Sequence, residues 1–458
     1  MFLGLFIFVE FKMCSSLAHT GAENSDFASV ASSPHFVDKT LLIKEFFKYK
    51  TNNRMLVTAP RRFGKSLNMN MIKTFSEALL DEKGNWTIRE ETENYKTFAD
   101  NNLTIFQDSV FFDKHFGKYP VIFLNFSQLN YSGFDVFISG FKAMISAEFE
   151  SRRYLLKSSI LTKRDSGKRE GYYNKTVITD LHERDLRKSM LFLSKLLFVH
   201  FNYTKCIILI DDYDTPVRNA IVESSSDLES ILEFMRNFNA EVLKSNPNVD
   251  RALINSCLAI GDVITAKDTN IKYIPFLEDA RFLDFYGFMK DEVKVLLKKV
   301  RKLHMLEVIQ KWYGGYSVQM GNIRVFNPFS ILNFLKYKKI ERFWAKSVNI
   351  DDLEEVFLYP EVKKKIEKIM DTTVEIKATH KIKIKHISRL KEIVNITQTD
   401  ISEKDADLFI KYLTDLGYFN VVYNGEKVTI LDIPNLELNY EIDNIISYTS
   451  YFINKTNI

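Results

Sequence analysis

The segment APRRFGKS at Ala59 to Ser66 decides the fold of this chain. It follows a short apolar run, RMLVT at Arg54 to Thr58, and precedes a helical pattern from Ser66 to Leu80. A phosphate-binding loop needs this order of strand, loop and helix. Its backbone N–H groups wrap phosphate oxygens, and the following helix directs its positive end toward them. The segment therefore predicts a nucleotide-binding P-loop.

The end of this segment matches the consensus G-x-x-x-x-G-K-[ST]. Lys65 is expected to reach the β- and γ-phosphates and to act in catalysis, and Ser66 to supply a hydroxyl to Mg²⁺. The predicted nucleotide-binding residues are Pro60, Arg61, Arg62, Phe63, Gly64, Lys65, Ser66 and Leu67. The two arginines either bind the nucleotide or another anion, or lie in water at the surface. Ala59 departs from the consensus glycine and would cost stability if its φ had to be positive.

A second segment, ILIDDYD at Ile208 to Asp214, ends an apolar run with aspartates. Alone it fits any strand that ends in a turn, but after a P-loop it has the pattern of a Walker B strand. We expect Asp211 to lie beside Ser66 and Mg²⁺, and Asp212 to orient the attacking water. Many ATPases have Glu at the second position. Because Asp is one methylene shorter, it favours binding over fast hydrolysis.

The rest of the first half alternates strand and helix patterns. Further compact apolar runs lie at Val121 to Asn125 and Ala252 to Ile260, and helical periodicity lies at Phe134 to Leu155, Leu181 to His200 and Leu228 to Leu243. We predict a layered α/β fold, a parallel sheet flanked by helices. Asn255 and Ser256 are phosphate-sensing groups or hydrogen-bonded core residues. The polar stretch Lys157 to Lys175 predicts an exposed loop.

The second half is mostly helical. Helical patterns at Glu292 to Val300, Met305 to Tyr313 and Phe329 to Tyr337 predict a lid domain over residues 286–400. A helix at Asp405 to Leu416 precedes two strands around Asn424-Gly425, a type I′ hairpin signal. This order predicts a winged-helix-like segment over residues 401–458. The P-loop core is then expected over residues 36–285, with a first helix from Asp38, its cap, to Lys50.

Residues 1–35 are expected to lie outside the core. Phe2 to Val9 is an apolar run that resembles a short signal peptide, but it lacks a basic start and Met13 is an alternative first residue. Residues 19–35 have no apolar periodicity and predict a linker. Eight N-x-[ST] sequons favour secretion slightly, although Asn125 falls in a predicted buried strand. Localisation is therefore either intracellular or, with a working signal, in the secretory pathway. Phe2 to Val9 is too short to span a bilayer, and no other stretch reaches membrane-spanning length.

Charge and cysteines narrow the classes of partner. The net charge of +4 arises from 63 basic and 59 acidic residues, so a nucleic-acid signal must be local. Basic clusters lie at Lys298 to Lys302, Lys336 to Arg342, Lys363 to Lys365 and Lys381 to Lys391. The last, KIKIKHISRLK, alternates like a half-buried strand and suggests a nucleic-acid surface, although a solvated basic face is the commoner meaning. Three cysteines without a CxxC pair encode neither a disulfide framework nor a zinc site.

Five blocks in order give the chain a family resemblance. They are VDKTLLIKEFF at Val37 to Phe47, APRRFGKSLNMNMIKTF at Ala59 to Phe75, LIDDYDTPV at Leu209 to Val217, FYGFMKDEV at Phe285 to Val293, and WYGGY with FNPFS between Trp312 and Ser330. Together they resemble the AAA-ATPase-like family over about Phe36 to Trp344. The resemblance implies a RecA/AAA-type P-loop core, a helical lid and a winged-helix-like segment.

Two features of the resemblance bear on activity. Many relatives continue into a PD-(D/E)XK nuclease-like domain, and because this chain stops at Ile458 we expect no nuclease activity. The family usually has Asp-Glu where this chain has Asp211-Asp212, and Thr-Gly where it has Ile260-Gly261. Both departures affect hydrolysis more than nucleotide binding.

Three functional hypotheses follow. The first is an ATPase that uses ATP and Mg²⁺ and couples hydrolysis to a conformational change. The second is a nucleotide-binding scaffold with weak or no turnover, as Ala59 and Asp212 suggest. The third is a nucleic-acid-associated ATPase that uses the basic C-terminal half. The sequence leaves the oligomeric state and the coupled partner open.

Overall fold

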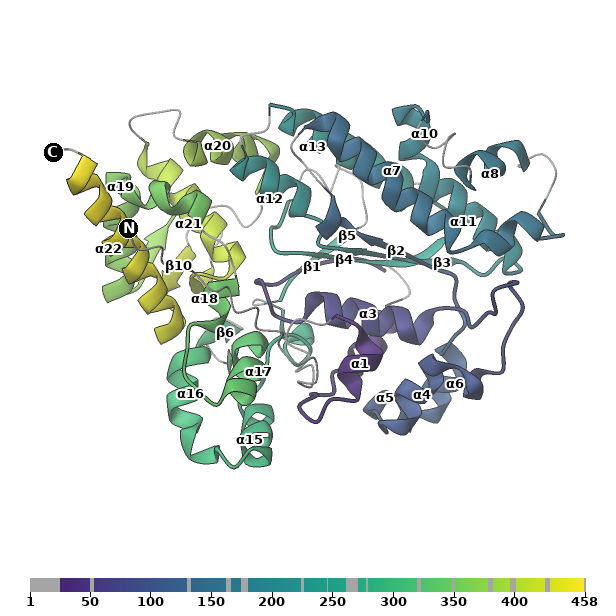
Figure 1. Ribbon diagram of the computed structural model, residues 1–458, viewed down its shortest axis with the longest axis horizontal. Helices are drawn as coiled ribbons and strands as arrows, with labels where there is room; N and C mark the ends of the chain where they lie inside the picture. Colours follow the sequence, from purple (N-terminus) through teal and green to yellow (C-terminus); the bar gives the residue numbers. More distant parts are fainter. Residues whose placement is uncertain are drawn as a thin grey trace, which may run out of the picture.

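A five-stranded parallel sheet forms the centre of the computed structural model (Figure 1). The structure describes residues 25–456 except 50–52, 130–132, 162–165, 174–179, 224–225, 245, 261–270, 277–278, 319–322, 348–350, 378–381, 396–400 and 425–428. The strand order is β2-β3-β4-β1-β5. The strands are β1 (Arg54–Thr58), β2 (Val121–Asn125), β3 (Cys206–Asp211), β4 (Val249–Ser256) and β5 (Ile271–Pro275). The predicted α/β class is confirmed.

The strand order brings the two predicted motifs close together. β1, which leads into the P-loop, and β3, which ends at Asp211 just before Asp212, both pair with β4. All six residues of β3 are buried, because helices cover both faces of the sheet. Since the strands are parallel, the carboxyl ends of β1, β4 and β3 meet at one edge, where ligands bind in open α/β sheets.

Helices lie in two layers, one on each side of the sheet (Figure 1). One layer contains α7 (Phe134–Glu150), α8 (Ser166–Tyr173), α10 (Glu183–Arg187), α11 (Ser189–His200), α12 (Thr215–Val222) and α13 (Leu228–Asn239). The other contains α1 (Phe27–Ala31), α3 (Lys65–Ser76), α4 (Glu93–Asp100), α5 (Thr104–Gln107) and α6 (Ser109–His115), and α2 (Leu42–Lys48) precedes β1. Short helical turns such as η2 (Phe126–Gln128) connect these elements.

The prediction of a linker is wrong for residues 25–35. They contain α1, whose Phe27 is fully buried and packs on Phe98 of α4 with 5.3 Å between ring centroids. Five residues are too few to show helical periodicity, so the sequence pattern missed this helix. Residues 1–24, including the signal-like run, lie outside the described part of the chain.

The predicted helix cap at Asp38 is also wrong. α2 begins at Leu42, four residues later, and its N-cap is Leu41. The Asp38 carboxylate instead accepts hydrogen bonds from Thr40 N at 2.8 Å and from Thr104 N at 2.7 Å. Asp38 therefore joins the start of the domain to α5, a contact between residues 66 positions apart that local patterns cannot reveal.

Two predictions in the helical layer need correction. The stretch Lys157 to Lys175, predicted as a loop, contains α8, and Tyr172 of that helix stacks on Phe149 with 4.5 Å between ring centroids. Two adjacent aromatic residues thus anchor an otherwise polar segment. The helix predicted at Leu181 to His200 is two helices, α10 and α11, separated at Lys188.

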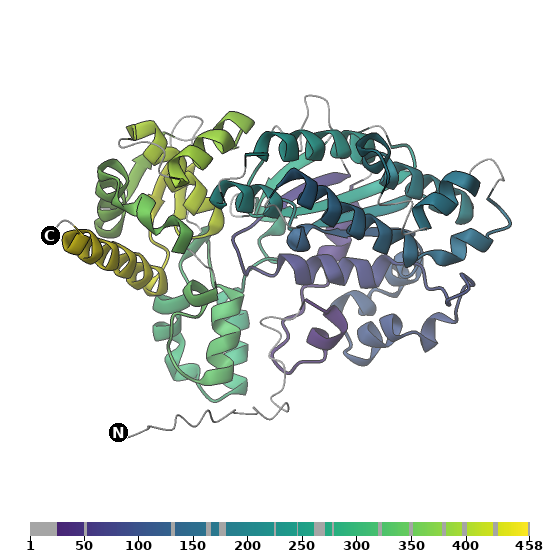
Figure 2. The ribbon, with the colours of Figure 1, turned by 45° about the horizontal axis from the view of Figure 1, so that its top comes forward.

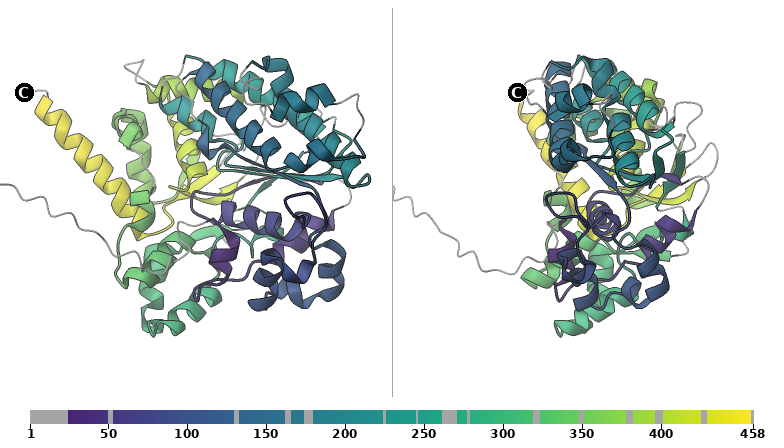
Figure 3. Two further views of the ribbon diagram at one scale, coloured as in Figure 1. Left: turned by 45° about the vertical axis from the view of Figure 1, so that its right-hand side comes forward. Right: turned by 90° about the vertical axis from the view of Figure 1, so that its right-hand side faces the viewer.

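The C-terminal half lies beside the sheet domain and contains more strand than the sequence predicts (Figure 2). Its helices are α15 (Lys290–Lys299), α16 (Leu306–Tyr313), α17 (Pro328–Tyr337), α18 (Phe343–Ser347), α19 (Pro360–Asp371), α20 (Ile384–Val394), α21 (Glu403–Leu416) and α22 (Leu436–Thr456). Its strands are β6 (Tyr316–Val318), β7 (Ile323–Val325), β8 (Val374–Ile376), β9 (Asn420–Asn424) and β10 (Thr429–Asp432). Helix α22 lies at the outer edge, away from the sheet (Figure 3).

The basic stretch at Lys381 to Lys391 was predicted to be a half-buried strand, and this prediction is wrong. From Ile384 onward it forms α20, which buries Ile387, Leu390 and Ile393 at helical spacing. Alternation over a few residues also fits a helix, so the period was misassigned. The predicted hairpin is confirmed as the antiparallel pair β9 and β10, although its turn lies outside the described residues.

A buried carboxylate, Glu437, joins helices of the C-terminal half. It accepts hydrogen bonds from the Ser330 hydroxyl at 2.8 Å and from Trp344 N at 2.6 Å. Burial raises the pKa of Glu437 to about 7, although these hydrogen bonds oppose the shift. Between pH 4.5 and about 7 the folded protein keeps a proton that the unfolded chain has released. Rising pH therefore lowers the free energy of unfolding in this window.

We predict that Glu437→Gln removes this pH dependence. Glutamine keeps the size of the side chain and carries no charge, so at pH 8 the variant should be more stable than wild type by on the order of 1 to 3 kcal/mol. At pH 5 the two proteins should differ little. Urea unfolding at both pH values measures this, and an equal difference at pH 5 and pH 8 would contradict it.

Candidate functional site

The predicted P-loop is a tight turn between β1 and α3. Its positive φ angles fall at Arg62, with 64°, and at Gly64, with 84°. Ala59 does not have a positive φ, and its N–H donates to Ser256 O at 3.2 Å. The departure from the consensus glycine therefore causes no backbone strain, and the structure removes that objection to phosphate binding.

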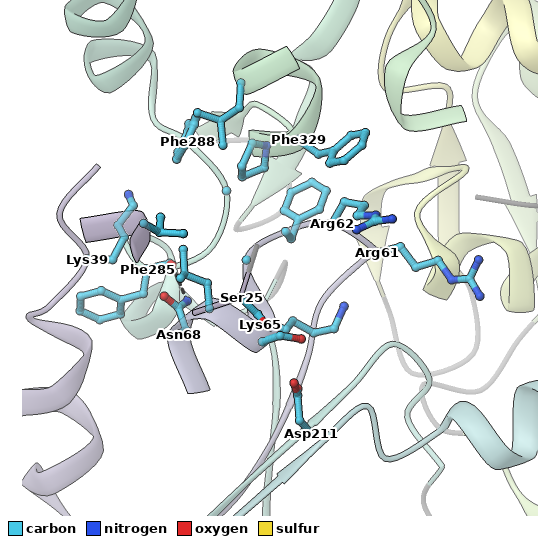
Figure 4. Close-up of a pocket in the computed structure, with 18 of the residues that line it drawn as sticks. Ser25, Lys39, Arg61, Arg62, Lys65, Asn68, Asp211, Phe285, Phe288 and Phe329 are labelled. Atoms are coloured by element: carbon cyan, nitrogen blue, oxygen red, sulfur yellow. Dashed lines mark hydrogen bonds between the residues drawn. The ribbon is translucent and has the colours of Figure 1, made fainter. Parts of the chain in front are cut away.

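Lys65 is held over this loop by the loop's own backbone. Its Nζ donates to Ala59 O at 2.9 Å and to Pro60 O at 2.8 Å, and lies 3.3 Å from Cys257 Sγ. The side chain is only 6% exposed, so the ammonium depends on these acceptors. It lies beside Asp211 in the cavity (Figure 4).

Asp211 occupies the place that the sequence predicts. It ends β3, it is 2% exposed, and it hydrogen-bonds the Ser66 hydroxyl. Burial and the nearby charge of Asp212 raise the pKa of Asp211 to about 6, whereas hydrogen bonds from Ser66 and Asn255 lower it. A hydroxyl beside a carboxylate fits Mg²⁺, which binds one or two protein oxygens together with substrate phosphates. Among the described residues no group of three metal-ligating side chains forms a protein-only cage.

Asp212 has an unusual backbone conformation, with φ of 50°. Non-glycine residues in this region are strained, and such strain clusters at functional sites. Asp212 lines the same cavity as Lys65 and Asp211, as a water-orienting carboxylate must. Of the two neighbouring polar residues, Ser256 donates to Leu258 O, a core contact. Asn255 donates to Lys65 O at 2.9 Å and thereby joins β4 to the first residue of α3.

Next to these residues lies a buried ion pair that the sequence patterns do not predict. Asp214 and Arg218 pair at 2.7 Å between Oδ2 and Nε, and both are almost fully buried. Asp214 also accepts from Cys257 N and Leu258 N, each at 3.1 Å. Burial alone would raise the pKa of Asp214, but Arg218 and these N–H groups hold it below its ordinary value. The only sequence signal for this pair is its spacing of four residues, which many exposed helical pairs share.

A cavity of about 530 Å³ connects these groups to an apolar wall. The wall side chains come from segments far apart in the sequence: Phe36, Val37, Phe285, Phe288, Phe329 and Leu332. At this end of the cavity, Lys39 pairs with Glu292 at 2.5 Å (Figure 4). The family blocks contain most of these residues, yet only the fold shows that they face the loop. A cavity that combines cationic side chains with an apolar wall suits a nucleotide.

The C-terminal half contacts all four residues between Ala59 and Gly64. Both backbone groups of Arg61 form hydrogen bonds to this half. Its N–H donates to Leu416 O at 3.2 Å, and its carbonyl accepts from Trp344 Nε1 at 3.0 Å. The neighbouring side chains pack against this half as well: Pro60 lies against Gly417, Arg62 over the Phe329 ring at 4.8 Å, and Phe63 edge-on to Tyr316 at 4.8 Å. The conformation of the loop therefore depends on residues about 250 to 360 positions away.

Comparison with known proteins places the chain in a family. A family model described as a predicted AAA-ATPase matches residues 25–263, which include α1, the P-loop and β3. No curated protein matches the chain significantly. In the described part of the chain, no helix is both long and apolar enough to cross a membrane. The match covers more than half of the sequence, and the chain therefore belongs to the AAA-ATPase-like family of predicted AAA-ATPases.

Proposed function

We propose that this protein is a Mg²⁺-dependent ATPase whose active site is the cavity at the end of β1 and β3. The observation that carries the proposal is the meeting of Lys65, Ser66, Asp211 and Asp212 at one cavity from two separate elements. Membership of a family of predicted AAA-ATPases supports nucleotide binding and ATPase activity at a coarse level.

Each residue has a distinct role in this proposal. The loop N–H groups and Lys65 hold the β- and γ-phosphates, and Ser66 and Asp211 hold Mg²⁺, which neutralises charge on the phosphates. Asp212 orients the attacking water and accepts its proton. The apolar wall of Phe36, Val37, Phe285, Phe288, Phe329 and Leu332 receives the base.

Replacing Asp212 with asparagine tests the catalytic role. Asparagine keeps the size of the side chain but cannot accept a proton, so turnover should fall by at least about 100-fold. ATP binding should change little, because Asp212 is not among the phosphate-binding groups. Phosphate release and ATP affinity are measured on the same preparations. Equal turnover by wild type and Asp212→Asn, with intact binding, would assign the water-orienting role to another residue.

A nucleotide-binding scaffold is the second candidate. The short, strained Asp212 in place of the usual Glu favours it. ATP binding without phosphate release above the Lys65→Ala background would decide for the scaffold.

The C-terminal half is proposed to be the moving part. We assign residues 286–400 as a lid and the remainder as a winged-helix-like segment, supported by the order of α21, β9 and β10. Nucleic-acid binding stays a prediction. Several of its basic residues are engaged within the protein: Lys365 pairs with Asp407, Arg389 with Asp405, and Arg342 with Glu441. These pairs reduce the charge available to phosphates. DNA that stimulates turnover in a salt-dependent manner would support nucleic-acid binding.

A further inference from the structure

The two adjacent arginines of the P-loop lie in different surroundings. Arg62 is exposed and covers the Phe329 ring. Arg61 is largely buried and lines the cavity together with Lys65, Cys257 and Arg218. Figure 4 shows Arg61 at the end of the site opposite Lys39 and Phe285. Arg61 thus lies beyond Lys65 when the cavity is followed from Lys39 and Phe285.

The Arg61 guanidinium donates no hydrogen bond to any residue that the structure describes, although its backbone N–H and C=O are both bonded. The nearby carboxylate, Asp214, already accepts from Arg218 Nε, Cys257 N and Leu258 N. Burial and the charge of Arg218 lower the pKa of Arg61. Arg61 therefore lies beside a second guanidinium, and Asp214, the carboxylate that acts on Arg61, already accepts hydrogen bonds from other groups.

We propose that Arg61, supported by Arg218, binds the third phosphate and makes the site selective for nucleoside triphosphates over diphosphates. If the base lies at the Phe285 end of the apolar wall and the loop amides and Lys65 hold the phosphate chain, the last phosphate lies at the Arg61 end. A guanidinium suits this task, since its planar fork binds two phosphate oxygens at once. This inference rests on the proposed nucleotide-binding function.

The arrangement also gives Arg61 a way to report phosphate loss. Its carbonyl accepts from Trp344 and its N–H donates to Leu416, both in the C-terminal half. When the third phosphate leaves, the side chain loses its anion and the repulsion from Arg218 returns. The residue that senses the phosphate is therefore the residue whose backbone joins the two halves.

Equilibrium binding of ADP and of a non-hydrolysable ATP analogue, both with Mg²⁺, tests the proposal on the full chain. Arg61→Ala should weaken binding of the analogue by about 10- to 100-fold and of ADP by less than about 3-fold. Arg61→Lys should fall between wild type and Arg61→Ala, because it keeps the charge and loses the fork. Arg62→Ala is the matched control and should weaken both nucleotides by the same factor.

The outcomes separate this inference from the proposed function. If Arg61→Ala leaves the ratio of the two affinities unchanged while Lys65→Ala loses both nucleotides, the selectivity role is wrong and nucleotide binding stands. If Lys65→Ala binds both like wild type, the proposed function itself fails. Thermal unfolding checks the fold, and Arg61→Ala should not lower the melting temperature, because it removes the repulsion with Arg218. If Arg61→Ala does lower the melting temperature, the test uses Arg61→Lys instead. An unchanged ratio of the affinities for the ATP analogue and ADP in Arg61→Lys would then overturn the selectivity role.

Discussion

Lys65→Ala is expected to weaken ATP binding by at least about 100-fold. The Nζ atom lies over the loop carbonyls of Ala59 and Pro60, where it can turn to the phosphates. Charge-assisted contacts to two phosphates contribute about 3 kcal/mol or more, which corresponds to this loss. Isothermal titration with ATP and Mg²⁺ measures the effect.

Lys73→Ala is the matched control for this substitution. Lys73 lies on the same helix, α3, but its Nζ pairs with Glu77 at 3.3 Å and its side chain is about one-third exposed. A surface pair of this kind contributes less than about 1 kcal/mol to stability, and the control should bind ATP like wild type. If Lys65→Ala kept wild-type affinity, the segment 59–66 would not be a phosphate-binding loop.

Gly417→Ala is expected to weaken nucleotide binding although residue 417 is about 350 positions from the loop. Gly417 ends α21 with φ of 109°, and a Cβ atom there would lie 2.8 Å from Pro60 Cβ and 3.3 Å from Trp344 Cζ2. A side chain in this conformation costs about 1 to 3 kcal/mol. Relief requires Pro60 or Trp344 to move, and both hold the loop. We expect affinity for ATP to fall about tenfold or more.

Gly84→Ala separates this effect from general destabilisation. Gly84 also has a positive φ, 84°, and a Cβ atom there would lie 2.8 Å from the side chain of Tyr154, which does not line the cavity. Both variants should unfold at lower temperature than wild type. The coupling of the C-terminal half to the loop predicts that affinity falls only in Gly417→Ala. Equal affinities in the two variants would show that the contact with Pro60 has no role in binding.

Local patterns identified the parts of the site that lie on single segments. The strand, loop and helix around Lys65, and the strand that ends at Asp211, were predicted from consecutive residues, because hydrophobic periodicity and motif spacing are local properties. The apolar wall was not predicted, since its residues come from before β1, after β5 and from α17. The ion pair of Asp214 and Arg218 was missed for a different reason: four-residue spacing is common on exposed helices, and only burial makes it distinctive.

The errors in the predicted fold also arise because local patterns carry limited information. Helix α1 is too short to show periodicity, and α20 begins with an alternation that also fits a strand. Strands β6, β7 and β8 contain three residues each, and pairing across the sheet, which the sequence does not display, defines them.

The sequence by itself determined that this chain has a parallel α/β core with a loop of P-loop pattern, and a later strand that ends at Asp211 and is followed by Asp212. Glycine, lysine and serine at fixed spacing carry that information without reference to the rest of the chain. Only the tertiary structure decided that Ala59 is unstrained, that Arg61 and Arg62 differ in surroundings, and that Trp344 and Gly417 hold the loop. Each of these depends on contacts between residues hundreds of positions apart, or on backbone angles that such contacts impose.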